Sequence, residues 1–274
     1  MPSRPDKPLE IAVAGLGAIG VVVARRLAAG IEGLHLAGVV GRTPERAAAA
    51  VAGILPLPSV MTLPEAVVAA DVVVDCAPSA AFPALAGAAV EGGCMLVTVN
   101  AAALLSNMAL VERARATGAR IVVASGALLA LDAVAAAAEG EIRSITMVTR
   151  KPPAGLEGAP YLVERGIKLA GLTAPLKVFE GSAGEGAKGF PANVNVAAAL
   201  SLAGLGPDLT RLEIWADPGV DRNLQSYEVE ADSSRFRVEI ENVPSVENPR
   251  TGRITALSVV ATLRRLTAPL RVGT

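Results

Sequence analysis

The sequence predicts an α/β protein with an N-terminal doubly wound parallel sheet, followed by an α+β domain with a mostly antiparallel sheet. Three observations support this prediction. A turn of the pattern G-x-G-x-x-G joins an apolar strand to an apolar helix near the N-terminus. Apolar strands and helices then alternate to about residue 125, which is typical of a parallel sheet. Beyond residue 141 the strands alternate apolar and polar residues, as half-exposed strands do.

The glycine-rich turn follows a strand at residues 11–14 and precedes an apolar helix at residues 18–29. Gly15 can adopt the tight turn, Gly17 lets a pyrophosphate approach the backbone, and Gly20 lets strand and helix pack closely. The N–H groups at the helix N-terminus can bind the phosphates. The alternative is an ordinary strand–helix turn. We expect a Rossmann dinucleotide-binding site that comprises Gly15, Leu16, Gly17, Ala18, Ile19 and Gly20.

The second strand, residues 34–40, bears on the choice of cofactor. NAD-specific sites usually carry Asp or Glu at the end of this strand, where the carboxylate binds the ribose hydroxyls. Here Gly41, Arg42 and Thr43 follow. Arg42 can pair with a 2′-phosphate and Thr43 can add a hydrogen bond, which favours NADP, or both NADP and NAD, over NAD alone. Alternatively, Arg42 stacks on the adenine or faces water, and Thr43 caps a helix at residues 44–52.

The strand at residues 71–76 is apolar on both faces, as buried parallel strands are. It ends at Ala77 and Pro78, in a loop at the carboxyl edge of the sheet, so we expect both residues to contact the cofactor. Cys76 is interpreted as a small buried residue. His35, the only histidine, begins the second strand at the opposite edge and is interpreted as a packing or surface residue. The remaining elements expected here are helices at 64–70, 80–90 and 106–117 and strands at 95–100 and 119–124.

The second half is expected to form an antiparallel sheet with helices on one side. Residues 232–234 predict a hairpin turn between its last two strands. A final helix at 251–266 is expected to return and pack on the first domain. We therefore expect a dinucleotide-binding domain at residues 1–125 plus about 245–274, and an α+β domain at 126–244. The elements expected in the α+β domain are strands at 142–150, 177–180, 209–216, 224–231 and 235–241 and a helix at 192–202.

Composition excludes several kinds of partner. The chain has 274 residues, a net charge of −1 and no basic block, so no nucleic-acid partner is expected. The N-terminal residues are polar, and the most apolar window contains Ser125, Gly126 and Asp132, so no membrane association is expected. Cys76 and Cys94 lack metal-site spacing, so no metal is expected, and their number suits a reducing cytoplasm.

Six segments add to the glycine-rich turn: SGALLALDAV (125–134), RKPP (150–153), FEGSA (179–183), FPANVNVAAALSLAG (190–204), ADP (216–218) and NVPSVENPRTGRITALS (242–258). With that turn they span nearly the whole chain, and together they are far more specific than the turn. They resemble the L-aspartate dehydrogenase family. The resemblance implies oxidation of L-aspartate, a dicarboxylic amino acid, to iminosuccinate with reduction of NAD or NADP, or the reverse reaction. Iminosuccinate then hydrolyses to oxaloacetate and ammonia or enters NAD biosynthesis. A homodimer with a catalytic α+β domain is also implied.

The chain departs from the family at the expected acid/base. After ADP the family pattern runs N-x-His, whereas this sequence has Asn223, Leu224 and Gln225. Gln225 shares a strand face with Tyr227 and Val229 and is expected to point inward. A glutamine can hold a water or a substrate oxygen, but it cannot take up a proton. Three interpretations stay open: a variant with another base or substrate, such as a reductase of another imine or oxo acid; an active-site mutant; or an NAD(P)-binding relative with little turnover.

The resemblance also assigns binding residues. Ala127 matches a family cofactor contact, through its backbone. Asn193 and Asn195 match an asparagine segment whose amide can hold the nicotinamide carboxamide; Asn195 is favoured, and a helix N-cap is the alternative. Lys151 and Lys188 are candidate partners for the two substrate carboxylates, with solvated surface charges as the alternative. Asp217 either orients a neighbouring side chain or caps the turn at Pro218.

Overall fold

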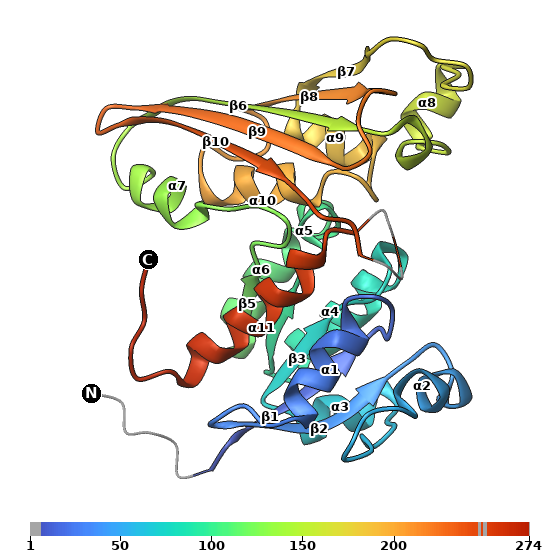
Figure 1. The fold of residues 1–274 in the computed structure, drawn as a ribbon. Coiled ribbons are helices and arrows are strands. Elements are labelled where there is room, and N and C mark those ends of the chain that lie inside the picture. Colours follow the sequence, from blue (N-terminus) through green and yellow to red (C-terminus); the bar gives the residue numbers. More distant parts are fainter. Residues whose placement is uncertain (1–6, 246–247, 249–250, 274) are drawn as a thin grey trace. The chain divides into compact units, whose positions relative to one another are not determined.

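The computed structural model describes residues 7–245, 248 and 251–273. The chain forms two compact units, drawn in Figure 1. The first unit comprises Met1–Asn100, Asn107–Gly126 and Thr255–Arg271. The second unit comprises Ala101–Ser106, Ala127–Ile254 and Val272–Thr274.

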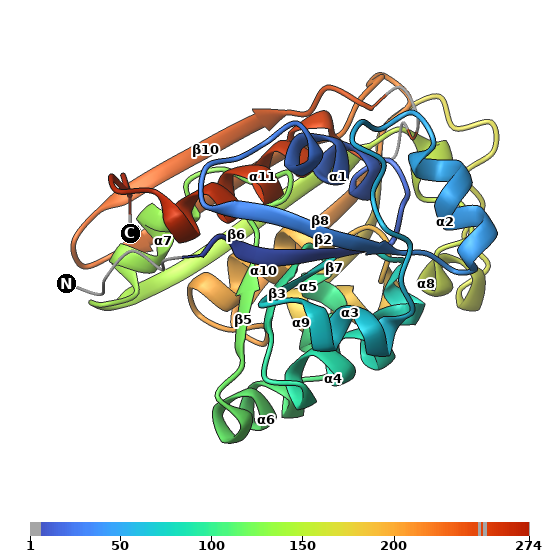
Figure 2. The same cartoon turned by 90° about the horizontal axis from the view of Figure 1, so that it is seen from below.

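The first unit contains a five-stranded sheet of strand order β2-β1-β3-β4-β5. Every neighbouring pair is parallel, which confirms the predicted parallel sheet, and Figure 2 shows β1 and β2 side by side. Strand order reverses next to β1, so the glycine-rich turn that follows β1 lies where doubly wound sheets bind ligands. The strands are β1 Leu9–Ala14, β2 Leu34–Val40, β3 Val72–Asp75, β4 Met95–Thr98 and β5 Arg120–Val123.

Helices cover both faces of this sheet. The helix after the glycine-rich turn begins at Gly20, two residues later than expected, because residues 15–19 form the turn itself. Thr43 caps α2 as predicted: its side chain accepts a hydrogen bond from Arg46 N at 3.4 Å. Thr62 and Glu65 form a capping box on α3. The helices are α1 Gly20–Ala28, α2 Pro44–Val51, α3 Leu63–Ala69, α4 Phe82–Glu91, α6 Ala109–Thr117 and α11 Arg253–Thr267, with a 3₁₀ turn at Ser79–Ala81.

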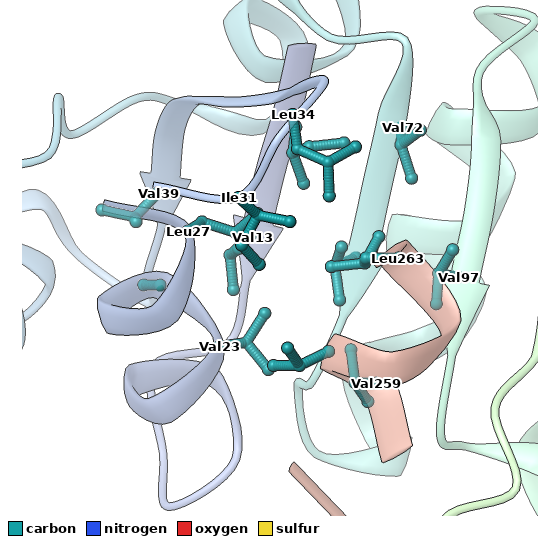
Figure 3. Close-up of a cluster of buried hydrophobic side chains, with 14 of the residues drawn as sticks. Val13, Val23, Leu27, Ile31, Leu34, Val39, Val72, Val97, Val259 and Leu263 are labelled. Atoms are coloured by element: carbon teal, nitrogen blue, oxygen red, sulfur yellow. The ribbon is translucent and has the colours of Figure 1, made fainter. Parts of the chain in front are cut away.

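Alternation along β1 explains the two layers. Ile11 and Val13 belong to a cluster that includes Val23 of α1, whereas Ala12 packs with Ala66 of α3 on the other side. Figure 3 shows Val13 and Val23 in the first cluster. The same cluster contains three side chains of α11, so the prediction that the last helix returns to the first domain is confirmed. These side chains are Val259, Val260 and Leu263.

The second unit contains a five-stranded sheet of order β10-β9-β6-β8-β7. The prediction of a mostly antiparallel sheet is confirmed, and β6 and β8 form its one parallel pair. They are parallel because three helices and β7 lie between them in the chain and return it to the starting edge of the sheet. The strands are β6 Ile142–Lys151, β7 Leu176–Ser182, β8 Thr210–Ala216, β9 Leu224–Ala231 and β10 Arg235–Glu241.

The helices of the second unit lie on one face of its sheet (Figure 1). The expected long helix is α10 Asn195–Ala203. Short helices α5, α8 and α9 were not predicted; α9 is rich in glycine and is held by a capping box between Ser182 and Glu185. These further helices are α5 Ala101–Leu105, α7 Leu131–Ala137, α8 Pro160–Glu164 and α9 Ala183–Gly189.

Candidate active site

The glycine-rich turn is tightly packed at two of its three glycines. Gly15 has φ 88°, and a Cβ added there would lie 2.3 Å from Ala77 N. A Cβ on Gly20 would lie 1.8 Å from Gly15 O. A Cβ on Gly17, in contrast, would meet no atom within 4 Å. The turn therefore has the close packing that the motif requires, and it leaves an open position at the glycine that would face a pyrophosphate.

At the N-terminus of α1, no side-chain cap or acidic side chain competes with a bound anion for the free N–H groups. Its N-cap residue, Ile19, makes no side-chain capping bond, and no acidic side chain lies in the first turn. The helix dipole and its first N–H groups therefore favour a negatively charged ligand at this end.

A buried network that sequence reasoning missed fixes the loop after β3. Asp75 is fully buried; its Oδ1 accepts a hydrogen bond from Ala77 N at 3.0 Å. Its Oδ2 accepts bonds from Thr98 Oγ1 at 2.7 Å and from Asn100 Nδ2 at 2.8 Å. Asn100 Nδ2 also donates to Ala77 O at 2.9 Å. Burial raises the pKa of the Asp75 carboxyl, and these hydrogen bonds oppose that rise. The network holds Ala77 and Pro78 at the carboxyl edge of the sheet.

Replacement of Thr98 by valine should lower the free energy of unfolding by about 1–3 kcal/mol, because the buried Asp75 carboxylate loses one donor. The measurement is urea-induced unfolding followed by circular dichroism. Thr173→Val, at an exposed loop position, is the matched control. Equal stability of the two variants would show that the Thr98–Asp75 bond contributes nothing.

Arg42 is exposed directly after β2, and no ion pair joins it to any residue that the structure describes. The Thr43 hydroxyl caps α2 by accepting a hydrogen bond from Arg46 N. The backbone hydrogen bond of Glu45, and after it the hydrogen bond with the Thr43 side chain, lower the pKa of Glu45. Arg42 therefore presents a cation that has no ion-pair partner among the described residues and is available to bind an anion.

Arg42→Ala should weaken NADP binding by at least about tenfold, because an arginine–phosphate bond is charge-assisted. NAD binding should change much less, since NAD has no 2′-phosphate. Titration of both cofactors by calorimetry measures the difference, and Arg46→Ala on the same surface is the control. Equal weakening of NADP and NAD would remove Arg42 from the 2′-phosphate role.

Gln225 lies on β9 and is 4% exposed, beside the buried Tyr227 and Val229 on the same face. The prediction that it points inward is confirmed. Its Oε1 accepts a hydrogen bond from Asn242 Nδ2 at 3.1 Å, and the same nitrogen lies 3.3 Å from Ala127 O. Asn242 therefore links Gln225 to the loop with Ala127. Asn223 precedes β9, and its carbonyl accepts a bond from Asn242 N at 3.1 Å. Sequence reasoning did not assign Asn242, although it opens one of the resembling segments.

The structure separates the two candidate lysines. Lys151, at the end of β6, is only 5% exposed, and burial lowers its pKa to about 8. Within the described ranges no acidic group pairs with its ammonium. Lys188 lies exposed in the last turn of α9. Thr149, two residues before Lys151, has a buried hydroxyl that finds no hydrogen-bond partner in the described part of the chain.

The asparagine segment is tied to the backbone of the second unit. Asn195 Oδ1 accepts a bond from Ala102 N at 3.0 Å, and Asn193 Nδ2 donates to Gly155 O at 2.8 Å. The N-cap interpretation is wrong for both, because Val194 occupies that position of α10. Among the described residues, Asn195 Nδ2 and Asn193 Oδ1 have no hydrogen-bond partner.

The contacts of Asp217 and His35 show the structural role of each residue. Asp217 does both things expected of it: Oδ1 accepts from Gly219 N at 2.9 Å, and Oδ2 accepts from Arg150 Nη1 at 3.3 Å. The Arg150 guanidinium also stacks 4.6 Å from the centre of the Trp215 ring. His35 is a surface residue, with Nδ1 2.6 Å from Glu10 Oε2.

A parallel sheet with a dinucleotide-type glycine turn, joined to a domain with a buried polar cluster, defines a two-domain dehydrogenase that uses NAD or NADP. Residues 15–124 match the family model described as homoserine dehydrogenase, NAD binding domain. Residues 132–266 match the model described as aspartate dehydrogenase, C-terminal. The chain belongs to the L-aspartate dehydrogenase family, which confirms the resemblance seen in its sequence.

Named relatives cover the whole chain. It is 54% identical to an L-aspartate dehydrogenase from Bradyrhizobium diazoefficiens, over 97% of this chain and 94% of the relative. It is 51% identical to L-aspartate dehydrogenase 3 from Bordetella bronchiseptica, over the full length of both. The fold matches the crystal structure of aspartate dehydrogenase from Thermotoga maritima with a TM-score of 0.71 at 20% identity, covering 97% of this chain and 99% of that one.

No helix in the described residues is long and apolar enough to cross a membrane. The same residues contain no group of three or more His, Cys, Asp or Glu side chains that could hold a metal ion.

Proposed function

We propose that the protein oxidises L-aspartate to iminosuccinate with reduction of NAD or NADP, and that iminosuccinate then hydrolyses to oxaloacetate and ammonia or feeds NAD biosynthesis. The observation that carries the proposal is the burial of Lys151 without an acidic partner among the described residues, in a chain whose full-length relatives are named L-aspartate dehydrogenases. A buried cation of this kind suits a substrate with carboxylate groups. The reverse reaction, reduction of iminosuccinate, uses the same groups.

The residues of the first unit fit the proposed cofactor. The turn from Gly15 through Leu16, Gly17, Ala18 and Ile19 to Gly20 would bind the pyrophosphate, because Gly17 is open and α1 starts without a competing acid. Arg42 and Thr43 would lie at the adenosine ribose, and Ala77 and Pro78 beside the turn. When bound, the nicotinamide supplies the acceptor for the substrate hydride.

The second unit would hold the nicotinamide and the substrate. The Ala127 backbone and the free Nδ2 of Asn195 are the proposed nicotinamide contacts, with Asn193 Oδ1 as the alternative to Asn195. Lys151 and the exposed Lys188 are proposed to bind the two carboxylates. Gln225 and the neighbouring Asn223 occupy the place of the family acid/base, where Gln225 can position a water but cannot accept the proton that the substrate ammonium releases.

A panel assay tests the proposed reaction. The protein is incubated with amino acids or oxo acids plus ammonia, with NAD(H) and NADP(H) in turn, and absorbance at 340 nm is followed. Aspartate-dependent reduction of either cofactor supports the proposal. Turnover confined to a substrate without a second carboxylate would overturn it.

Gln225 favours a second candidate function. Because glutamine lacks a proton to exchange near neutral pH, the protein is alternatively an NAD(P)-binding relative with little turnover, or a reductase of another imine or oxo acid that uses water as the proton source. Tight NADPH binding without any absorbance change identifies the first case. NADPH consumption with a non-aspartate imine identifies the second.

We further propose a cytoplasmic homodimer. Cys76 and Cys94 are both free thiols, which suits a reducing compartment. The sheet face of the second unit that carries no helices presents half-buried and exposed side chains on adjacent strands, with a hollow among them, and such a face suits a second copy of the chain. The side chains include Val148, Arg150, Leu224, Ser226 and Glu239.

Val148→Glu should convert the dimer to a monomer, because a carboxylate would be buried between the two copies. Light scattering coupled to size-exclusion chromatography measures the mass. Glu230→Gln, at an exposed position near the far end of β9, is the control. A wild-type protein that elutes as a monomer at all concentrations would contradict the dimer.

A further inference from the structure

β6 buries a lysine without a counter-ion and a threonine hydroxyl without a hydrogen-bond partner, as far as the described residues show. Lys151 and Thr149 are two residues apart, so their side chains project from the same face of the strand. Among the described residues, Thr149 is 1% exposed and its hydroxyl has no hydrogen-bond partner, and Lys151 is 5% exposed and has no counter-ion. Both arrangements are unfavourable in a buried environment, so both favour a ligand that supplies negatively charged acceptor atoms.

The strands on either side of β6 supply no counter-ion to Lys151. In register, Thr149 lies opposite Gln225 of β9, and Lys151 lies beside Ala216 of β8. The nearest acid along β8 is Asp217, whose oxygens bind Arg150 and Gly219 N. The pair thus offers an ammonium and a hydroxyl, the two donors that a carboxylate accepts, next to the position of the family acid/base.

We propose that Lys151 and Thr149 form a subsite for the side-chain carboxylate of the substrate and thereby set the preference for dicarboxylic over monocarboxylic amino acids. This inference rests on the proposed function. Bound there, the carboxylate accepts hydrogen bonds from the ammonium and the hydroxyl, so Lys151 gains a counter-ion and Thr149 gains a hydrogen-bond partner. The subsite selects by charge, because a substrate with a methyl group in this place leaves the ammonium unpaired.

The subsite also implies a dependence of binding on pH. Burial lowers the pKa of Lys151 to about 8, so above that pH the empty site holds a neutral amine, which cannot form an ion pair. On the buried face that carries Lys151, β8 has no charged side chain, and the titratable group of β9 is Tyr227, whose hydroxyl donates to Leu129 O at 2.7 Å. Arg150 and Asp217 pair with one another, and Lys188 and Glu185 of α9 are exposed. Affinity for a dicarboxylate should therefore be full below pH 8 and fall as the pH rises through about 8.

The test compares succinate with butyrate, which has four carbons but one carboxylate, as ligands of the holoenzyme with NADP bound. In calorimetry at pH 7, Lys151→Met should weaken succinate binding by about 100-fold and leave the weak butyrate binding unchanged. Lys151→Arg keeps the charge, so it should retain most of the affinity and lose the decline above pH 8. Thr149→Val should weaken succinate binding by about tenfold and leave Tm unchanged or higher, since valine removes the unsatisfied hydroxyl; Thr149→Ser should restore binding.

Each outcome separates the subsite from the proposed function. If wild-type holoenzyme binds succinate and Lys151→Met binds it equally well, the subsite is wrong although the enzyme still takes dicarboxylates. If Thr149→Val loses affinity only in step with a lower Tm, Thr149 is merely structural and the subsite is wrong as stated. If the wild type binds NADP and turns over only monocarboxylic substrates, the proposed function fails as well.

Discussion

Gln225→His should raise turnover of L-aspartate by at least about tenfold, since a positioned acid/base typically contributes about 10²–10⁴-fold in rate. The position suits the change. Gln225 is 4% exposed and points into the polar cluster, where its Oε1 already accepts a hydrogen bond from Asn242 Nδ2. To act as a base, a histidine there must present its lone-pair ring nitrogen to the substrate amine, while its protonated ring nitrogen donates to the Asn242 amide oxygen after that amide turns over.

The measurement is kcat with saturating aspartate and NADP or NAD, followed at 340 nm across pH 5–10. A new ionisation near the ordinary histidine pKa of about 6.5 should appear in the rate profile of the variant. Ser226→His is the matched control, because Ser226 lies on the opposite face of β9. A folded Gln225→His variant that binds cofactor and shows no gain would count against aspartate as the substrate.

Gly17→Ala and Gly20→Ala should both abolish useful cofactor binding, but for different reasons. At Gly20 the added methyl would lie 1.8 Å from Gly15 O, so the turn must move, and we expect a loss of stability of about 3 kcal/mol or more. At Gly17 the methyl meets no protein atom, so the fold should keep its stability. The methyl instead occupies the space of the pyrophosphate and should weaken NAD and NADP about 100-fold.

Thermal unfolding and cofactor titration of the same two variants check this contrast. Gly20→Ala should lower Tm by about 6–12 °C, whereas Gly17→Ala should leave it unchanged. Gly87→Ala is the control, because a Cβ there also meets nothing within 4 Å and the residue lies in α4, away from the turn. Full cofactor affinity in Gly17→Ala would refute the role given to the glycine-rich turn.

Regular patterns made most of the fold predictable. The parallel sheet follows from the glycine-rich turn and the apolar strands, and α11 returns to the first unit because Val259 and Leu263 give it an apolar face that must be buried. The parallel pairing of β6 with β8 was not predictable, because strand alternation defines which side chains share a face but not which strand lies alongside. Helices as short as α5 and α8 carry too few turns to leave a periodic pattern.

The candidate site was predictable in its residue types but not in its contacts. The inward direction of Gln225 follows from the period of two along a strand. The sequence does not predict that Lys151 is buried and Lys188 exposed, because both are lysines near apolar residues. Only the packing around β6 buries Lys151. The network of Asp75, Thr98 and Asn100 was also missed: each residue alone is an ordinary polar end to a strand, and the hydrogen bonds join residues of two different strands.

The position of Trp215, with Arg150 stacked on its ring, makes intrinsic tryptophan fluorescence a probe of the helix-free sheet face. The chain contains one tryptophan, so its intrinsic emission near 350 nm or below comes from β8 alone. The ring is half-buried on the helix-free sheet face, with its Nε1 donating to Glu213 at 2.9 Å and the Arg150 guanidinium over its plane. Association of two copies through that face would remove water from the indole and shift its emission to the blue. Dilution of unlabelled protein in a fluorimeter would then give the dissociation constant of the dimer directly.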